Sequence, residues 1–185
     1  MKTEHGKERP EIYNSLEALA PPGGGGRGAG GRGDRERRPD HRQPPPVLEP
    51  EYLRGGYFDN NGHLRREIFI EWPEKVLKPK LNATKNSLRA FYTMLRMAKT
   101  QFDRQRGNRD KAQEDAKNQL LKMRVGAEYQ LTRKVIGQVC HDFLIRNIDV
   151  VLQPDARFEE FAKNLNAFLE HFQAVVAYLP EKAEH

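Results

Sequence analysis

Residues 135–152 read VIGQVCHDFLIRNIDVVL, and this stretch decides the fold. Its apolar side chains recur at steps of three and four residues, the spacing of an α-helix, and they leave almost no polar face. A helix that is apolar on nearly all sides belongs in the interior of a bundle. The stretch therefore predicts a central helix built on Ile136, Val139, Cys140, Phe143, Leu144, Ile148 and Val151.

Three further stretches carry one apolar face each, at residues 82–106, 109–132 and 155–179. Their spacing is that of amphipathic helices. A first helix is expected over residues 63–77, strained or ended near Pro73, because proline lacks the N–H that a helix interior uses. No segment shows convincing strand-like alternation between turns. The sequence therefore predicts an all-α fold, a compact bundle of about five helices.

The first fifty residues differ sharply from the rest in composition. Residues 21–46 hold eight Gly, six Pro and six Arg, with neither Val nor Leu. Such a stretch buries too little apolar surface to offset the entropy lost on ordering it. We therefore expect a disordered Gly/Pro/Arg-rich tail at residues 1–50, a helical bundle at residues 51–180 and a short C-terminal tail at residues 181–185. The Arg-Gly alternation resembles RNA-binding segments, but acidic neighbours cancel half of the arginines and favour a solvated linker.

Positive charge is concentrated between residues 75 and 134, which hold sixteen Lys or Arg and five Asp or Glu in a chain of net charge +6. Only Asp103 interrupts the bases before residue 110, so intrahelical ion pairs cannot account for them all. A surplus on one stretch favours a polyanionic partner over a plain solvated face. The predicted RNA-binding residues are Lys85, Arg89, Arg96, Lys99, Lys122, Arg124 and Arg133.

The pattern of these bases predicts contacts to phosphate rather than to nucleobases. Lys85, Arg89 and Arg96 lie within about 40° of one another round a helix, away from its apolar stripe. Phosphate contacts give affinity and register without reading sequence. Aromatic side chains that could stack on bases are few near this face, and Tyr92 and Tyr129 are the two candidates.

No combination of residues suggests catalysis, a metal or a cofactor. Residues 57–62 read YFDNNG, which predicts a tight turn, because the spacing of a calcium loop is missing. Cys140 and the adjacent His141 point about 100° apart on a helix, and a cysteine among apolar neighbours is ordinarily inert. His171 is expected at the edge of the bundle. We therefore expect a protein that is not an enzyme, without catalytic residues, metal or cofactor.

The remaining features indicate a cytoplasmic protein. The start of the chain lacks the apolar stretch of a signal peptide, and no run of eighteen apolar residues could cross a membrane. A single cysteine excludes an internal disulfide and fits a reducing compartment.

Four short motifs follow one another along the chain: Tyr57-Phe58-Asp59-x-x-Gly62-x-Leu64-Arg65, Leu88-Arg89-x-Phe91-Tyr92, Leu121-Lys122 and Phe172-x-Ala174-Val175-Val176-Ala177-Tyr178. In this order and spacing they resemble the small subunit of type III-A CRISPR–Cas (Csm) effector complexes. One position and one short stretch depart from that family. Ser87 stands where the family usually has Gln, and residues 125–129 read VGAEY where it normally has a Leu-Ala-Tyr run.

The resemblance implies a non-catalytic, all-helical subunit of an antiviral RNA-guided complex. Several copies would stack head to tail beside the duplex of guide RNA and target RNA. They would contact the backbone-forming subunit and the large subunit of the complex. Arg89, which matches the family's Leu-Arg pair, is the residue that the resemblance most directly implies in RNA binding. The alternative, from the charge pattern alone, is a helical protein–protein adaptor whose basic face binds an acidic partner.

Overall fold

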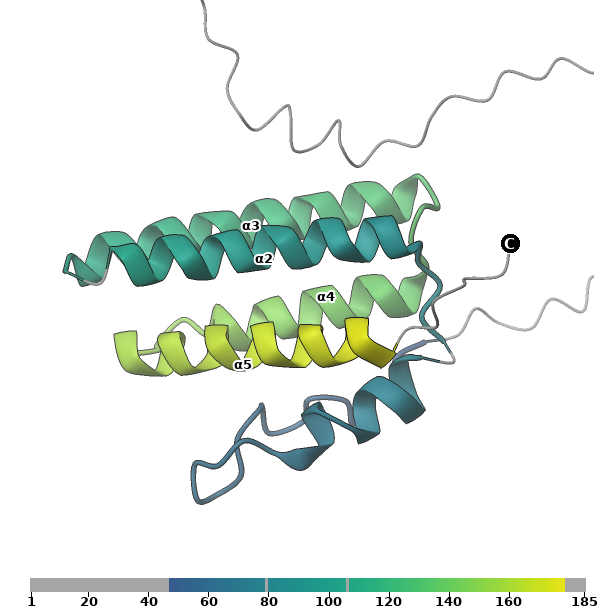
Figure 1. The fold of residues 1–185 in the computed structure, drawn as a ribbon, viewed down its shortest axis with the longest axis horizontal. Coiled ribbons are helices and arrows are strands. Elements are labelled where there is room, and N and C mark those ends of the chain that lie inside the picture. Colours follow the sequence, from purple (N-terminus) through teal and green to yellow (C-terminus); the bar gives the residue numbers. More distant parts are fainter. Residues whose placement is uncertain (1–46, 79, 106, 179–185) are drawn as a thin grey trace, which may run out of the picture. The chain divides into compact units, whose positions relative to one another are not determined.

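The computed structural model describes residues 47–78, 80–105 and 107–178. The predicted tails, up to residue 46 and over residues 181–185, lie outside these residues. Four α-helices form the bundle, α2 (Lys85–Arg104), α3 (Arg109–Thr132), α4 (Gln138–Val151) and α5 (Phe158–Tyr178). In Figure 1, α2 and α3 lie side by side above α4 and α5, and residues 47–78 lie beneath α4 and α5. The described residues contain no strand, so the predicted all-α class is confirmed.

The segment before α2 differs from the single helix expected over residues 63–77. It forms a short 3-10 helix, η1 (Arg66–Ile68), and a π-helix, η2 (Trp72–Leu77). Pro73 stands in the first turn of η2. Proline has no N–H, so it cannot donate the helical hydrogen bond to the carbonyl of residue 69, and the series of backbone hydrogen bonds is interrupted there. The series resumes in wider steps, and the Lys78 N–H donates to the Pro73 carbonyl at 2.9 Å. The first helix expected over residues 63–77 is therefore two short helices, and the irregularity expected near Pro73 is present.

The predicted turn at residues 57–62 is confirmed. Gly62 has φ of +79°, a left-handed conformation that glycine adopts without strain, and its N–H donates to the Asp59 carbonyl at 3.0 Å. The Asp59 carboxylate accepts from the backbone N–H groups of Asn61 and His63, at 2.9 Å each. Phe58 and Leu64 then pair in an antiparallel bridge, so the turn closes a small hairpin.

Local sequence explains where the long helices begin. The Thr84 hydroxyl accepts from the Ser87 N–H at 3.1 Å and caps α2. The Asn108 side chain accepts from the Lys111 N–H at 3.2 Å and caps α3, whose bounds match the predicted residues 109–132. The central helix α4 begins three residues later than expected, at Gln138. The reason is tertiary, because Ile136 bridges to Ala83 and the Gly137 N–H donates to the Asn82 carbonyl.

A buried polar network joins the segment before α2 to α4 and α5. The His171 Nδ1–H donates to the Ile68 carbonyl at 2.6 Å, and Nε2 accepts from the Tyr52 hydroxyl at 2.6 Å. The Asn147 amide donates to the Tyr52 oxygen at 2.9 Å and accepts from the Tyr57 hydroxyl at 2.7 Å. His171 is 0% exposed, so its expected place at the bundle edge was wrong. Burial lowers the pKa of His171 to about 4, which keeps the imidazole neutral at physiological pH.

The lone cysteine lies in the interior, as expected. Cys140 is fully buried in α4 and carries a free thiol. Burial raises the pKa of this thiol to about 12, so the nucleophilic thiolate is scarce at neutral pH. Leu48, just before the expected start of the bundle at residue 51, is also buried in the core.

Candidate nucleic-acid interface

The seven predicted RNA-binding residues belong to one helical hairpin, α2 and α3, including the residue that caps α3 at its C-terminus. The two helices run antiparallel (Figure 1). A Cβ atom added at Gly126 of α3 would lie 3.6 Å from the ring of Phe91 in α2, and this close approach defines their register. Along the helix axes, Arg96 of α2 is then level with Lys122 of α3, and Lys85 is level with Arg133, each to within about one helical turn.

The three bases of α2 form a face of unpaired positive charge. Arg89 and Arg96 are exposed and Lys85 is half-buried. Within residues 47–78, 80–105 and 107–178, no carboxylate forms an ion pair with any of the three. They lie about 120–160° round α2 from Phe91, and Lys85 and Arg96 are about 16 Å apart along the helix axis. We call Lys85, Arg89 and Arg96 the α2 basic face.

On α3, Lys122 and Arg133 are exposed and repeat the eleven-residue spacing of Lys85 and Arg96. Both lie within about 40° of Gly126, so they adjoin the seam between α2 and α3. Lys122 has no ion pair among the described residues. Arg133 contacts a tyrosine: its Nη1 donates to the Tyr129 hydroxyl at 3.0 Å, and its guanidinium lies 5.4 Å from the centre of the Tyr129 ring.

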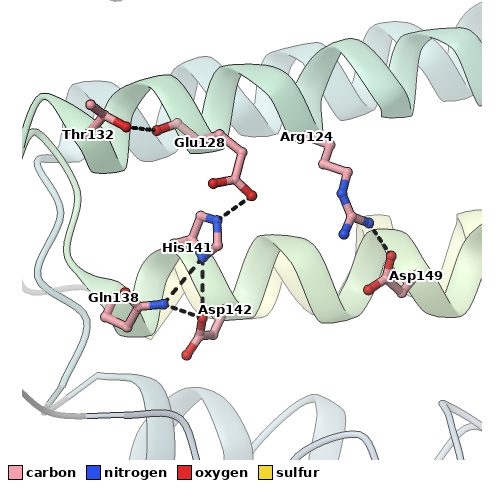
Figure 2. Close-up of polar contacts among 7 residues, drawn as sticks. All are labelled: Arg124, Glu128, Thr132, Gln138, His141, Asp142 and Asp149. Atoms are coloured by element: carbon pink, nitrogen blue, oxygen red, sulfur yellow. Dashed lines mark hydrogen bonds and ion pairs between the residues drawn. The ribbon is translucent and has the colours of Figure 1, made fainter.

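Two predicted residues have acidic partners. The Arg124 guanidinium pairs with the Asp149 carboxylate of α4 (Figure 2), and the Lys99 ammonium pairs with Asp103 one turn along α2. The Lys99 side chain is only 14% exposed. The hairpin thus separates Lys99 and Arg124 from the other five predicted bases, for which the described residues supply no acidic partner. These five lie on two adjoining faces, the flank of α2 and the seam side of α3, rather than on a single wall.

The acidic partners are what the sequence prediction missed. Asp103 stands four residues after Lys99, a spacing that signals a helical ion pair. Asp149 is twenty-five residues from Arg124, and no local pattern links them. The same α3–α4 seam holds His141, whose Nε2 lies 3.0 Å from a Glu128 carboxylate oxygen (Figure 2).

The two aromatic candidates also separate. Tyr92 is half-buried and packs edge-on against Phe172 of α5, with ring centres 5.8 Å apart. Tyr129 is 46% exposed on α3. Only Tyr129 therefore presents a free aromatic surface near the bases.

The part of the chain that the structure describes contains neither a metal-binding cluster nor a helix that could span a membrane. No group of three or more His, Cys, Asp or Glu side chains there is placed to hold a metal ion. No helix in the same residues is both long and apolar enough to pass through a membrane.

Comparison with known proteins identifies a family. A family model described as Csm2 Type III-A matches residues 71–182, more than half of the chain. This range contains α2 to α5 and all seven predicted bases. No curated protein and no solved structure matches the chain.

Proposed function

The chain belongs to the type III-A Csm2 family, the small subunit of the type III-A CRISPR–Cas effector complex, and from this premise we propose that it binds the phosphate backbone of RNA in that complex. The observation that carries the proposal is the α2 basic face. Its three cations have no carboxylate partner among the described residues, and they extend over about 16 Å of one helix. Unpaired bases in such a row favour a polyanion over an isolated anion.

The phosphate backbone fits this face better than nucleobases do. No exposed aromatic lies among Lys85, Arg89 and Arg96, so their contacts carry charge but no base recognition. A subunit that binds RNA of any sequence suits a complex in which guide pairing supplies specificity. Arg89, in the Leu88-Arg89 motif, is the residue that we expect to contribute most.

The proposal extends to partners and setting. We propose that guide RNA and target RNA are the ligands, with the backbone-forming subunit, the large subunit and further copies of this chain as neighbours. The role is non-catalytic, needs no cofactor and takes place in the cytoplasm without a membrane. Lys122 and Arg133 of α3 add contacts at the seam, while Lys99 and Arg124 contribute less because acids already pair with them.

The test is the salt dependence of RNA binding by the full chain. Log affinity should fall linearly with log salt, with about 0.7 units of slope for each phosphate contact to a single strand. Changing Lys85, Arg89 and Arg96 together to Glu should abolish binding and leave helicity intact. A matched control changes Arg66, Lys75 and Lys78 to Glu, the same charge change on exposed residues before α2.

The two triple variants separate the possible outcomes. Loss of binding only in the α2 variant supports the proposed face. Equal loss in both would mean that net charge alone attracts RNA, and full binding by the α2 variant would show that the face is wrong. If wild-type chain bound an acidic protein of the complex but no RNA, the adaptor alternative would hold instead.

A further inference from the structure

Tyr129 differs from every other tyrosine in the described residues. Tyr52 and Tyr57 are buried in the polar network, and Tyr92 and Tyr178 are half-buried. Of these tyrosines Tyr129 alone is exposed, at 46%, and it lies in the last turn of α3. An exposed ring on a helix whose apolar face is already packed is available to a partner outside the chain.

The ring is held in place by Arg133. A hydrogen bond of 3.0 Å joins Nη1 of Arg133 to the Tyr129 hydroxyl, and the guanidinium lies 5.4 Å from the ring centre. Both contacts come from the residue one turn further along α3. They orient the ring without burying it, so its remaining surface stays available.

Apolar neighbours extend the surface beside the ring. Leu121 and Val125 precede Tyr129 at steps of four residues, and they are 48% and 66% exposed. Lys122 lies on the same side, two turns before Tyr129, and Arg133 lies one turn after it. The apolar stripe of Leu121, Val125 and Tyr129 is therefore flanked by a cation at each end.

This combination fits RNA better than a protein partner. Aromatic rings between cations are the means by which proteins bind single-stranded nucleic acid, with bases stacked on the rings and phosphates held by the cations. Lysine is depleted from the cores of protein–protein interfaces, and Lys122 stands beside the stripe rather than at a distant rim. Every base has a π-face, so stacking here needs no particular sequence.

We propose that Tyr129 is a stacking site for an unpaired RNA base, with Val125 widening the apolar surface and Lys122 and Arg133 holding the adjoining phosphates. This inference rests on the proposed RNA-binding function. It adds that the RNA crossing α3 presents at least one base outside a duplex. The α2 basic face binds phosphate alone, whereas α3 binds phosphate and base.

The experiment measures binding of the full chain to a single-stranded RNA of about ten nucleotides that contains 2-aminopurine, a fluorescent base quenched by stacking. Tyr129→Leu keeps an apolar side chain but removes the ring, and should weaken binding by about 5- to 100-fold. Because no charge is removed, the salt slope should stay unchanged. Tyr129→Phe should bind within about twofold of wild type, since the ring remains. Phe69→Leu is the matched control, as Phe69 is an exposed aromatic outside the hairpin.

A second measurement uses only the wild-type chain. An RNA with abasic sites keeps every phosphate, so it should bind more weakly with the same salt slope. In a fully paired duplex the 2-aminopurine is already stacked and quenched, so adding the chain should not change its fluorescence. Equal affinity for the abasic and intact RNAs would overturn the stacking site while leaving phosphate binding in place. Absence of any salt-dependent RNA binding would overturn the proposed function and the stacking site together.

A protein partner on the stripe is the remaining outcome. If Tyr129→Leu bound RNA like wild type but no longer co-purified with the other subunits of the complex, the stripe would be a protein interface and the stacking site would be wrong. The free energy of unfolding of Tyr129→Leu is measured alongside, and is expected to match that of wild type, because the ring is already 46% exposed.

Discussion

Polar side chains are paired within the protein in the buried network around His171, and they are left unpaired on the α2 basic face. In the network, the side chains of Tyr52, Asn147 and His171 all find hydrogen-bond partners within the protein. On the α2 basic face, Arg89 and Arg96 find no acidic partner among the described residues. Unpaired polar groups cost much inside a protein and little in water, so the interior pairs them and the surface need not. The surface that a fold leaves unpaired is the one where a ligand can add contacts.

The largest effect is expected from removing the side chain of Asn147, which lies at the centre of the buried network. Asn147→Ala should lower the free energy of unfolding by about 2–4 kcal/mol, because the Tyr57 hydroxyl loses its acceptor and the Tyr52 oxygen loses a donor. Urea unfolding measures the change. Asn118→Ala, the same substitution at an exposed position of α3, should change stability by less than about 0.5 kcal/mol. Equal effects of the two changes would mean that the network carries no special weight.

Acid should weaken the network through His171. Its pKa of about 4 in the folded chain lies below the ordinary histidine value of 6.5, so the unfolded chain binds more protons between these values. The contribution of neutral His171 to the free energy of unfolding is therefore fully present above pH 6.5 and declines as the pH falls towards 4. The free energy of unfolding should drop by about 2 kcal/mol from pH 7 to pH 5. Unfolding curves at both pH values test the size of the loss. NMR titration of the imidazole provides the check, and a midpoint near 6.5 would contradict the expectation.

Two glycines offer a matched test of packing around the hairpin. A Cβ atom at Gly137 would lie 2.8 Å from Cβ of Asn82, so Gly137→Ala should cost about 1–3 kcal/mol. A Cβ atom at Gly126 would lie 3.6 Å from the Phe91 ring, which is ordinary contact. Gly126→Ala should therefore stabilise the chain by about 0.5–1 kcal/mol, since alanine favours a helix interior. Thermal unfolding of both variants should show shifts of opposite sign, and a loss of stability in both would contradict this packing.

The smallest effect is expected from Arg124, and it tests whether this residue belongs to the RNA-binding surface. Arg124→Gln should cost less than about 1 kcal/mol of stability, because its ion pair with Asp149 is partly exposed. It should also leave the salt slope of RNA binding unchanged, whereas Lys122→Gln should lower that slope by about 0.7. Both variants lose one charge from the same helix, so each controls for the other. Equal loss of slope would mean that Arg124 leaves Asp149 to contact RNA.

Elements governed by local rules were predictable from the sequence. The bounds of α3 follow from an asparagine cap at Asn108 and an unbroken amphipathic pattern, and the structure has them where they were expected. The start of α2 is similar, since threonine is a residue type that commonly caps helices and Thr84 caps this one. The bases at Lys85, Arg89 and Arg96 share one face because their spacing on a regular helix leaves no alternative. Whether they bind RNA stays a prediction.

Features decided by distant partners were not predictable. His171 was placed at the bundle edge because its sequence neighbours do not reveal Tyr52 and Ile68, more than one hundred residues away. The pairing of Arg124 with Asp149 is hidden for the same reason. Pro73 is a different case, since proline signalled a disturbance but did not specify a π-helix. The Lys99–Asp103 pair could have been predicted from its spacing, and was overlooked.

The buried thiol of Cys140 allows a label to be placed selectively at an introduced cysteine. Because this cysteine is the only one in the sequence and has no exposed surface, maleimide and similar reagents should leave the native chain unmodified. A cysteine introduced at an exposed position such as Met97 would then be the single reactive site. Dyes, spin labels or crosslinkers attached there could report where RNA and neighbouring subunits lie along the hairpin, without first removing the native residue.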